Sequence, residues 1–241
     1  MVGRFGGPLL LPADVPDPAH PFVASLDLAA LPAGEADLPL PSDGHLLLFA
    51  FPEEDNWYGR VGSAVYVPAG TPVGERDKHC SWWSTVDEYR EKIEDFPQGE
   101  LRATPDVTLP GYADEEYYEE EYAHLWEPGW PPYSAELLEL VRDLVEKEAG
   151  WGSMQVGGYA SEEGIGSDDP LESVVHAARA ALEKGKVDGP VSPDLSDWVL
   201  LADWHTDIDG WEGATVHWGI QRDDLVAHRF DRVFVTRYWN P

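Results

Sequence analysis

The run His45-Leu46-Leu47-Leu48-Phe49-Ala50-Phe51 decides the fold class of this 241-residue chain. The run is too short for a free-standing helix, and Gly44 and Pro52 bound it, so it is predicted to be a β-strand. Its apolar residues are continuous rather than alternating, which indicates a strand that is covered on both faces. We therefore expect this strand near the centre of a sheet.

Similar short apolar runs lie on either side of it, at residues 22–28 and 64–67, each bounded by Pro, Gly or Asp. Strand character returns in the last forty-odd residues, at 198–204, 214–221 and 232–239. Turn residues between short apolar runs are typical of strands joined by tight connections. Both ends of the chain are therefore predicted to be β-rich.

Helices are predicted between these ends. Thr85 followed by Glu88 has the form of a capping box for a helix that ends before Pro97. A second helical pattern follows Ser134. A third begins after Asp169 as N-cap, with Pro170 at its first position and a stop at Gly185. A short helix is also expected near residues 223–230, where acids precede bases as the helix dipole favours.

The two ends of the chain share a faint similarity. Residues 22–27 resemble residues 198–203, and residues 44–49 resemble residues 213–218. Short strand patterns also match by chance, so convergent patterning is the alternative to a duplication. We predict an α+β fold, β-rich, in which a tandem repeat of two β-rich motifs flanks a helical middle segment.

The predicted organisation is one domain over residues 1–241. It comprises a β-rich half at residues 1–80, an acidic helical segment at residues 81–150, and an α/β C-terminal half at residues 151–241.

The charge of the chain restricts its partners. Asp and Glu number 46 against 16 Lys and Arg, a net charge of −30. Nucleic acids and anionic membranes are recognised through Lys and Arg, so neither is an expected partner. Cys80 is the single cysteine, which excludes an intramolecular disulfide, and the longest apolar run is far shorter than the roughly 20 residues of a membrane span. We therefore expect a cytoplasmic protein, with Cys80 as a small buried apolar residue.

Several segments occur in the order found in one bacterial family. They are the Gly-Gly-Pro-Leu-Leu-Leu-Pro start at residues 6–12, residues 22–31, residues 38–49, Gly158-Tyr159, residues 198–203 and residues 223–233. Together they resemble the YwqG-like family, whose function has not been established. The resemblance implies an α+β fold with a tandem repeat of two β-rich motifs, and it assigns no catalytic residues.

The chain departs from this family at two loops. The family usually places Pro and then Gln-Gly-Asp after its Gly-Tyr, whereas Tyr159 here leads into residues 160–168. The family's Trp-Gly-Asp corresponds to residues 211–213, which read Trp-Glu-Gly. If these loops form a ligand site, its chemistry differs in this chain.

A polar cluster near the C-terminus is a candidate metal site. In an extended chain Asp203, His205, Asp207 and Asp209 would project from one face. Carboxylates with an imidazole suit divalent Zn, Mn or Fe. The alternative is a solvated strand-to-turn connection, because Asp-Gly is favoured at turns.

The acidic charge is concentrated in the middle of the chain. Residues 81–150 hold 19 acids and 5 bases, a net of −14. Aromatic residues are interleaved with the acids, which favours a recognition surface for a basic protein over a purely solvating run. The candidate contact residues are Asp114, Glu115, Glu116, Tyr117, Tyr118, Glu119, Glu120, Glu121, Tyr122, Trp126 and Trp130.

The leading hypothesis is therefore a non-enzymatic binding domain that presents this acidic aromatic surface to a basic partner, as an antidote or adaptor. It requires no cofactor. One alternative is a metal-dependent enzyme, a hydrolase, that uses the Asp203, His205, Asp207 and Asp209 cluster with a divalent metal. The other alternative is a small-ligand domain with its site between the two repeats. The sequence leaves the oligomeric state open.

Overall fold

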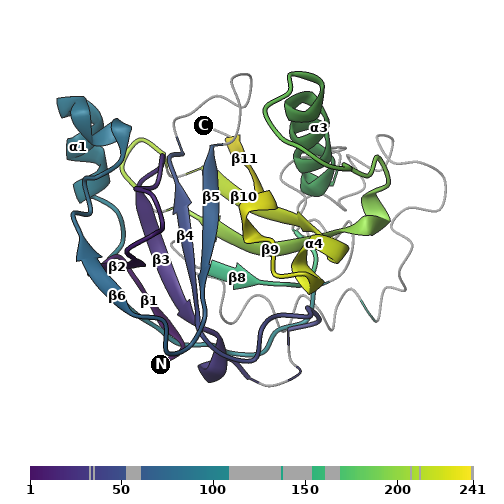
Figure 1. Ribbon diagram of the computed structural model, residues 1–241, viewed down its shortest axis with the longest axis horizontal. Helices are drawn as coiled ribbons and strands as arrows, with labels where there is room; N and C mark the ends of the chain where they lie inside the picture. The colour runs from purple at the N-terminus through teal and green to yellow at the C-terminus, as the bar shows by residue number, and fades with distance from the viewer. Residues whose placement is uncertain are drawn as a thin grey trace.

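The computed structural model describes residues 1–32, 34, 36–52, 61–108, 137, 154–160, 169–206, 208–211 and 213–239. Two antiparallel sheets form most of this structure (Figure 1). Within the described residues, no helix combines the length and the hydropathy that crossing a membrane requires.

The first sheet has the strand order β5-β4-β3-β1-β7. Its strands are β1 (Gly3–Phe5), β3 (Phe22–Asp27), β4 (His45–Ala50), β5 (Gly62–Val67) and β7 (Gly99–Leu101). In β4, Leu46 and Leu48 pack into one hydrophobic cluster, whereas Leu47 and Phe49 pack into another. The prediction that this run forms a strand covered on both faces is therefore confirmed, with β3 and β5 as its neighbours.

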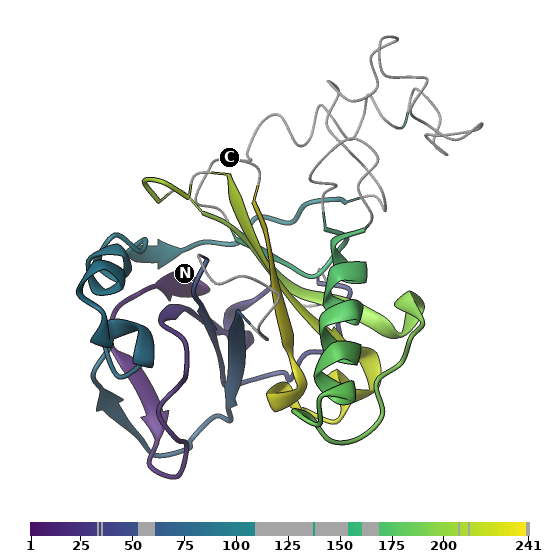
Figure 2. The same cartoon turned by 90° about the horizontal axis from the view of Figure 1, so that it is seen from above.

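The second sheet has the order β11-β10-β9-β8. Its strands are β8 (Met154–Val156), β9 (Trp198–His205), β10 (Ala214–Gln221) and β11 (Phe234–Trp239). Seen from above, this sheet lies between the first sheet and helix α3 (Pro170–Glu183) (Figure 2). One hydrophobic cluster contains residues of both sheets, and a separate cluster lies between α3 and the second sheet.

The two sheets also meet through hydrogen bonds near β5 and β11. The Val61 N–H donates to the Val235 carbonyl over 3.3 Å. The Trp218 indole N–H donates to the Ser63 carbonyl over 3.1 Å. These bonds fix the side of the second sheet that faces the first and leave its other side to α3.

Helix α3 begins and ends as predicted. The Asp169 carboxylate accepts a 2.8 Å hydrogen bond from the Leu171 N–H, Pro170 occupies the first turn, and Gly185 follows the helix with a φ of +62°. This left-handed conformation is one that Gly adopts without steric cost, which is why the helix stops there.

Helix α1 (Asp87–Glu94) differs from its prediction. Thr85 belongs to a 3-10 turn (Trp82–Thr85), and Val86 takes the N-cap position without a side-chain cap. The proposed capping box is therefore wrong, because the preceding turn already uses Thr85. The acidic segment contributes strand β7 as well as α1. Of the second predicted helix, which follows Ser134, only residue 137 is among the described residues.

Smaller elements lie beside the two main sheets. Strands β2 (Leu9–Pro12) and β6 (Val73–Arg76) form a two-stranded sheet. The helix expected near residues 223–230 is shorter, as α4 (Arg222–Val226), and a 3-10 turn (Phe230–Arg232) follows it.

The described part of the chain is α+β and β-rich, as predicted. The strand pairs β3–β4 and β9–β10 are both antiparallel and both contain a register shift. The tandem repeat remains a prediction.

Candidate functional site

A row of polar residues crosses the second sheet, with one residue from each strand. Gln155 of β8 lies opposite Asp203 of β9, Asp203 lies opposite His217 of β10, and His217 lies opposite Thr236 of β11. Directly opposed residues share a face of the sheet. We call Gln155, Asp203, His217 and Thr236 the polar row.

The centre of the polar row is a buried carboxylate–imidazole pair. Nδ1 of His217 lies 2.6 Å from Oδ1 of Asp203, and the two residues are 2% and 1% exposed. When Asp203 is ionised the imidazole N–H is the donor of this bond, because an ionised carboxylate only accepts hydrogen bonds. Removing these groups from water costs free energy that their mutual hydrogen bond offsets.

A second set of polar residues follows two positions along the strands. His205 lies opposite Thr215, and Thr215 lies opposite Tyr238. Nδ1 of His205 is 3.2 Å from Oγ1 of Thr215. Burial lowers the pKa of His205 below its ordinary value, the neighbouring Asp203 partly opposes this shift, and His217 adds to it. His205 is therefore held in its neutral form more strongly than a solvated histidine.

Asp169, the N-cap of α3, is an acid from another element whose ionisation responds to Asp203 and His217. Burial raises the pKa of its carboxyl, and the charge of Asp203 raises it further. The Leu171 N–H and the charge of His217 act in the opposite direction. Asp169 is thus electrostatically coupled to the central pair, although it comes from the helix rather than from the sheet.

Gln155 connects the polar row to the Gly158-Tyr159 loop. Its side-chain amide donates to the carbonyls of Gly157 and Tyr159 over 2.8 and 2.9 Å. The Tyr159 N–H donates to Oγ1 of Thr108 over 2.9 Å, and the Tyr159 side chain is 48% exposed. The loop at which the chain departs from the YwqG-like pattern therefore adjoins the polar row, and its next residues, 161–168, lie outside the described part.

Of the metal candidates, Asp203 and His205 lie on strand β9, whereas Asp209 lies beyond its end. Strand β9 ends at His205, and Asp209 lies in an exposed turn. The premise of an extended run from 203 to 209 is therefore wrong, because the chain leaves the sheet at Thr206, whose hydroxyl donates to the carbonyl of Ala214 over 3.0 Å. Asp207 is not among the described residues, and the residues that are described contain no group of three or more potential ligands that could hold a metal ion.

The partner-binding candidates from Asp114 to Trp130 lie outside the described residues. Of the acidic segment, residues 81–108 and 137 are described. Cys80 is partly rather than fully buried, and burial, followed by the charge of Asp17, raises the pKa of its thiol.

One motif of the family resemblance has a structural role. Asp224, in the segment 223–233, is 2% exposed and accepts hydrogen bonds from Arg229 over 2.6 Å and from Arg232 over 2.8 Å. Arg232 also donates to the carbonyls of Asp188 and Pro190. This cluster ties the segment after α3 to the C-terminal strands.

Sequence reasoning did not identify His217, Thr236 or Asp169 as site residues. The alternation of Thr215 and His217 with apolar residues in β10 was a readable signal, since alternating polar residues in a strand share one face. Whether His217 lies beside Asp203 and Thr236 depends on the order and register of the strands, which no local pattern specifies.

Comparison with protein families identifies a model described as a domain of unknown function (DUF1963), which matches residues 3–238. Because the match covers nearly the whole chain, the protein belongs to this family. A search of curated proteins found no match.

Proposed function

We propose that this DUF1963 protein is a cytoplasmic, non-enzymatic YwqG-like domain that binds a basic protein through its acidic middle segment. The observation that carries the proposal is the uneven charge. Residues 81–150 have a net charge of −14, whereas the other 171 residues share −16. Charge that serves only solubility has no need to be concentrated in this way.

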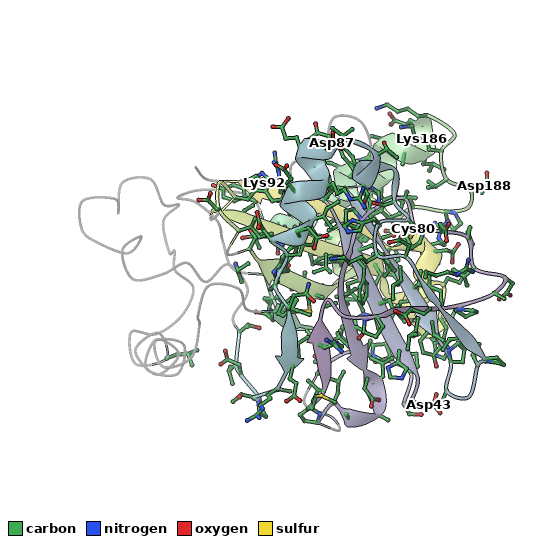
Figure 3. All side chains as sticks on the ribbon, turned by 90° about the vertical axis from the view of Figure 1, so that its left-hand side faces the viewer. Asp43, Cys80, Asp87, Lys92, Lys186 and Asp188 are labelled. Carbon is green, nitrogen blue, oxygen red and sulfur yellow. The ribbon has the colours of Figure 1, made fainter. Side chains whose placement is uncertain are left out.

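Helix α1 supports the proposal within the described residues. Asp87, Glu88, Glu91 and Asp95 are exposed on it or at its end. Lys92 is directed away from them, since its Nζ donates to the carbonyl of Asp209 over 2.5 Å and lies 5.7 Å from the centre of the Trp211 ring. Figure 3 shows Asp87 and Lys92 at different positions around α1. Lys92, one of the two basic residues of α1, therefore does not neutralise the exposed acids of the helix.

A surface of this kind acts mainly on association. Carboxylates attract a basic partner over a distance of about 10 Å at ordinary ionic strength, and this attraction weakens as salt screens it. The interleaved Tyr and Trp residues of the segment supply the apolar contact that charge alone does not. Binding should therefore be salt-dependent without being abolished by moderate salt.

The test is capture of partners from a native lysate by three forms of the full chain. One form is intact, and the second carries Asp→Asn or Glu→Gln at the six acids among residues 114–121. The third is a matched control with the same number of neutralised exposed acids elsewhere, namely Asp14, Asp37, Glu75, Glu183, Asp188 and Asp223.

We expect the second form to lose basic partners that the intact and control forms retain. The affinity of a purified partner should then fall with rising salt for the intact chain and much less for the second form. Equal capture by all three forms would refute the proposal, and equal loss in the second and third forms would show that net charge matters but its position does not.

A further inference from the structure

The face of the second sheet toward α3 has two halves. In one half, Trp198, Leu200 and Phe234 pack into a hydrophobic cluster with α3. In the other half lie the polar row and the set formed by His205, Thr215 and Tyr238.

The boundary between the halves coincides with the first turns of α3. A Cβ placed on Gly219 would lie 2.6 Å from a side-chain atom of Val174 and 3.2 Å from one of Leu171, so the helix rests closely on this glycine. His217 is the next residue of β10 on the same face, and Asp169 precedes Leu171. The polar half therefore begins beyond the N-terminal end of α3.

The polar half is built with groups that are costly to bury. Asp203 and Thr236 are each 1% exposed, and Oγ1 of Thr236 has no hydrogen-bond partner among the described residues. A buried hydroxyl without a partner lowers stability, and an apolar residue of the same shape, Val, would avoid this cost. At the margins, Gln155, His205 and Tyr238 are partly exposed, so the surface extends from a buried centre to an accessible rim.

We propose that this polar half-face is a binding site for a primary ammonium group, either of a small free amine or of a lysine side chain. An ammonium group has three hydrogen-bond donors and no acceptor. The half-face offers acceptors of matching chemistry in the Asp203 carboxylate and the Thr236 hydroxyl, and the Asp169 carboxylate of α3 interacts electrostatically with Asp203. The carboxylates disfavour phosphate and carboxylate ligands, since like charges repel most strongly where water is excluded.

The charge balance supports a cationic ligand over a neutral one. Burial lowers the pKa of His205, which disfavours a positive charge at the margin of the site. Two carboxylates, those of Asp203 and Asp169, share this part of the molecule with the imidazole of His217. A bound ammonium group offsets the charge of these carboxylates, whose burial is otherwise costly.

The test is a titration of the full chain at pH 7 with three probes of equal length: n-butylamine, n-butanol and butyrate. The signals followed are the imidazole NMR resonances of His205 and His217. We expect saturable shifts with butylamine, far weaker effects with butanol, and none with butyrate. Absence of a saturable shift with butylamine, or an equal response to butyrate, would overturn the proposal.

Two variants separate binding from folding. Thr236→Val keeps the side-chain shape but removes the hydroxyl, and Asp169→Asn keeps an N-cap residue but removes its charge. We expect each variant to weaken butylamine binding about tenfold. This is the change in dissociation constant that corresponds to the loss of one hydrogen bond to a charged group. Asp194→Asn is the matched control, because Asp194 also caps a turn, through the Ser196 N–H, but outside this face. Equal affinity in Asp169→Asn and Asp194→Asn, with circular dichroism showing both folded, would refute the site.

A fourth probe, N-acetyl-lysine methylamide, distinguishes the two sources of the ammonium group. Binding of both butylamine and this probe supports a lysine side chain as the occupant. Binding of butylamine alone supports a free amine. Amine binding does not involve the six acids that are neutralised among residues 114–121. The amine site and the proposed partner surface can therefore be refuted independently of each other.

Discussion

Nδ1 of His217 lies 2.6 Å from Oδ1 of Asp203, across two adjacent strands of the second sheet, with both side chains almost completely buried. A buried pair of this kind is costly to form and more costly to break, because removing one partner leaves the other buried without compensation. The pair is therefore the part of the polar row at which substitution should have the largest effect on stability.

Asp203→Ala should lower the free energy of unfolding by about 3–5 kcal/mol, the usual cost of breaking a buried pair. Urea unfolding at pH 7 measures this change in the free energy of unfolding. Replacing both residues, as Asp203→Leu with His217→Leu, should cost less than the sum of the two single changes, because no polar group is then left alone. Additive costs would show that the two side chains are not energetically coupled.

Asp169→Asn should raise the melting temperature at neutral pH. Because the pKa of Asp169 is raised in the folded state, its ionised form opposes folding, and this unfavourable contribution is fully present above the folded-state pKa. It fades as the pH falls toward the ordinary value of 3.8 and is absent below it. Thermal melts of the variant and the parent chain from pH 3 to 7 should converge at the acidic end; a constant difference would contradict the assignment.

His205 should make stability fall on mild acidification. Its pKa is lowered from the ordinary value of 6.5, so the unfolded chain takes up a proton before the folded chain does. Its contribution to stability is complete above pH 6.5 and declines from there down to the folded-state pKa. His205→Gln should flatten this part of the pH–stability curve, whereas His176→Gln, at an exposed position on α3, should leave it unchanged.

The Cys80 thiol should be alkylated slowly. Burial and the charge of Asp17 both raise its pKa, which lowers the fraction of reactive thiolate near neutral pH. Asp17→Asn should speed alkylation by iodoacetamide at pH 8, while Asp14→Asn should not. If Cys80 of the parent chain reacted as fast as free cysteine, neither burial nor the charge of Asp17 would be slowing alkylation.

Local structure was largely predictable where the determining groups are neighbours in the sequence. The boundaries of α3 follow from Asp169, Pro170 and Gly185, which act within one turn of the helix ends. The burial of β4 follows from its continuous apolar run. The predicted start of α1 is wrong because Thr85 suits either a helix cap or a preceding turn. Packing, rather than spacing in the sequence, selects between the two.

The sequence alone determined the β-rich α+β character, the charge of −30 and the positions of the main strands, because these depend on composition and on residues a few positions apart. The tertiary structure decided which polar residues meet. Asp203 and His217 are 14 positions apart, and Thr236 lies beyond a further helix, so strand order and register bring them into one row. Burial then gives this row its chemistry, since the same side chains in water would have neither coupled charges nor a hydroxyl without a hydrogen-bond partner.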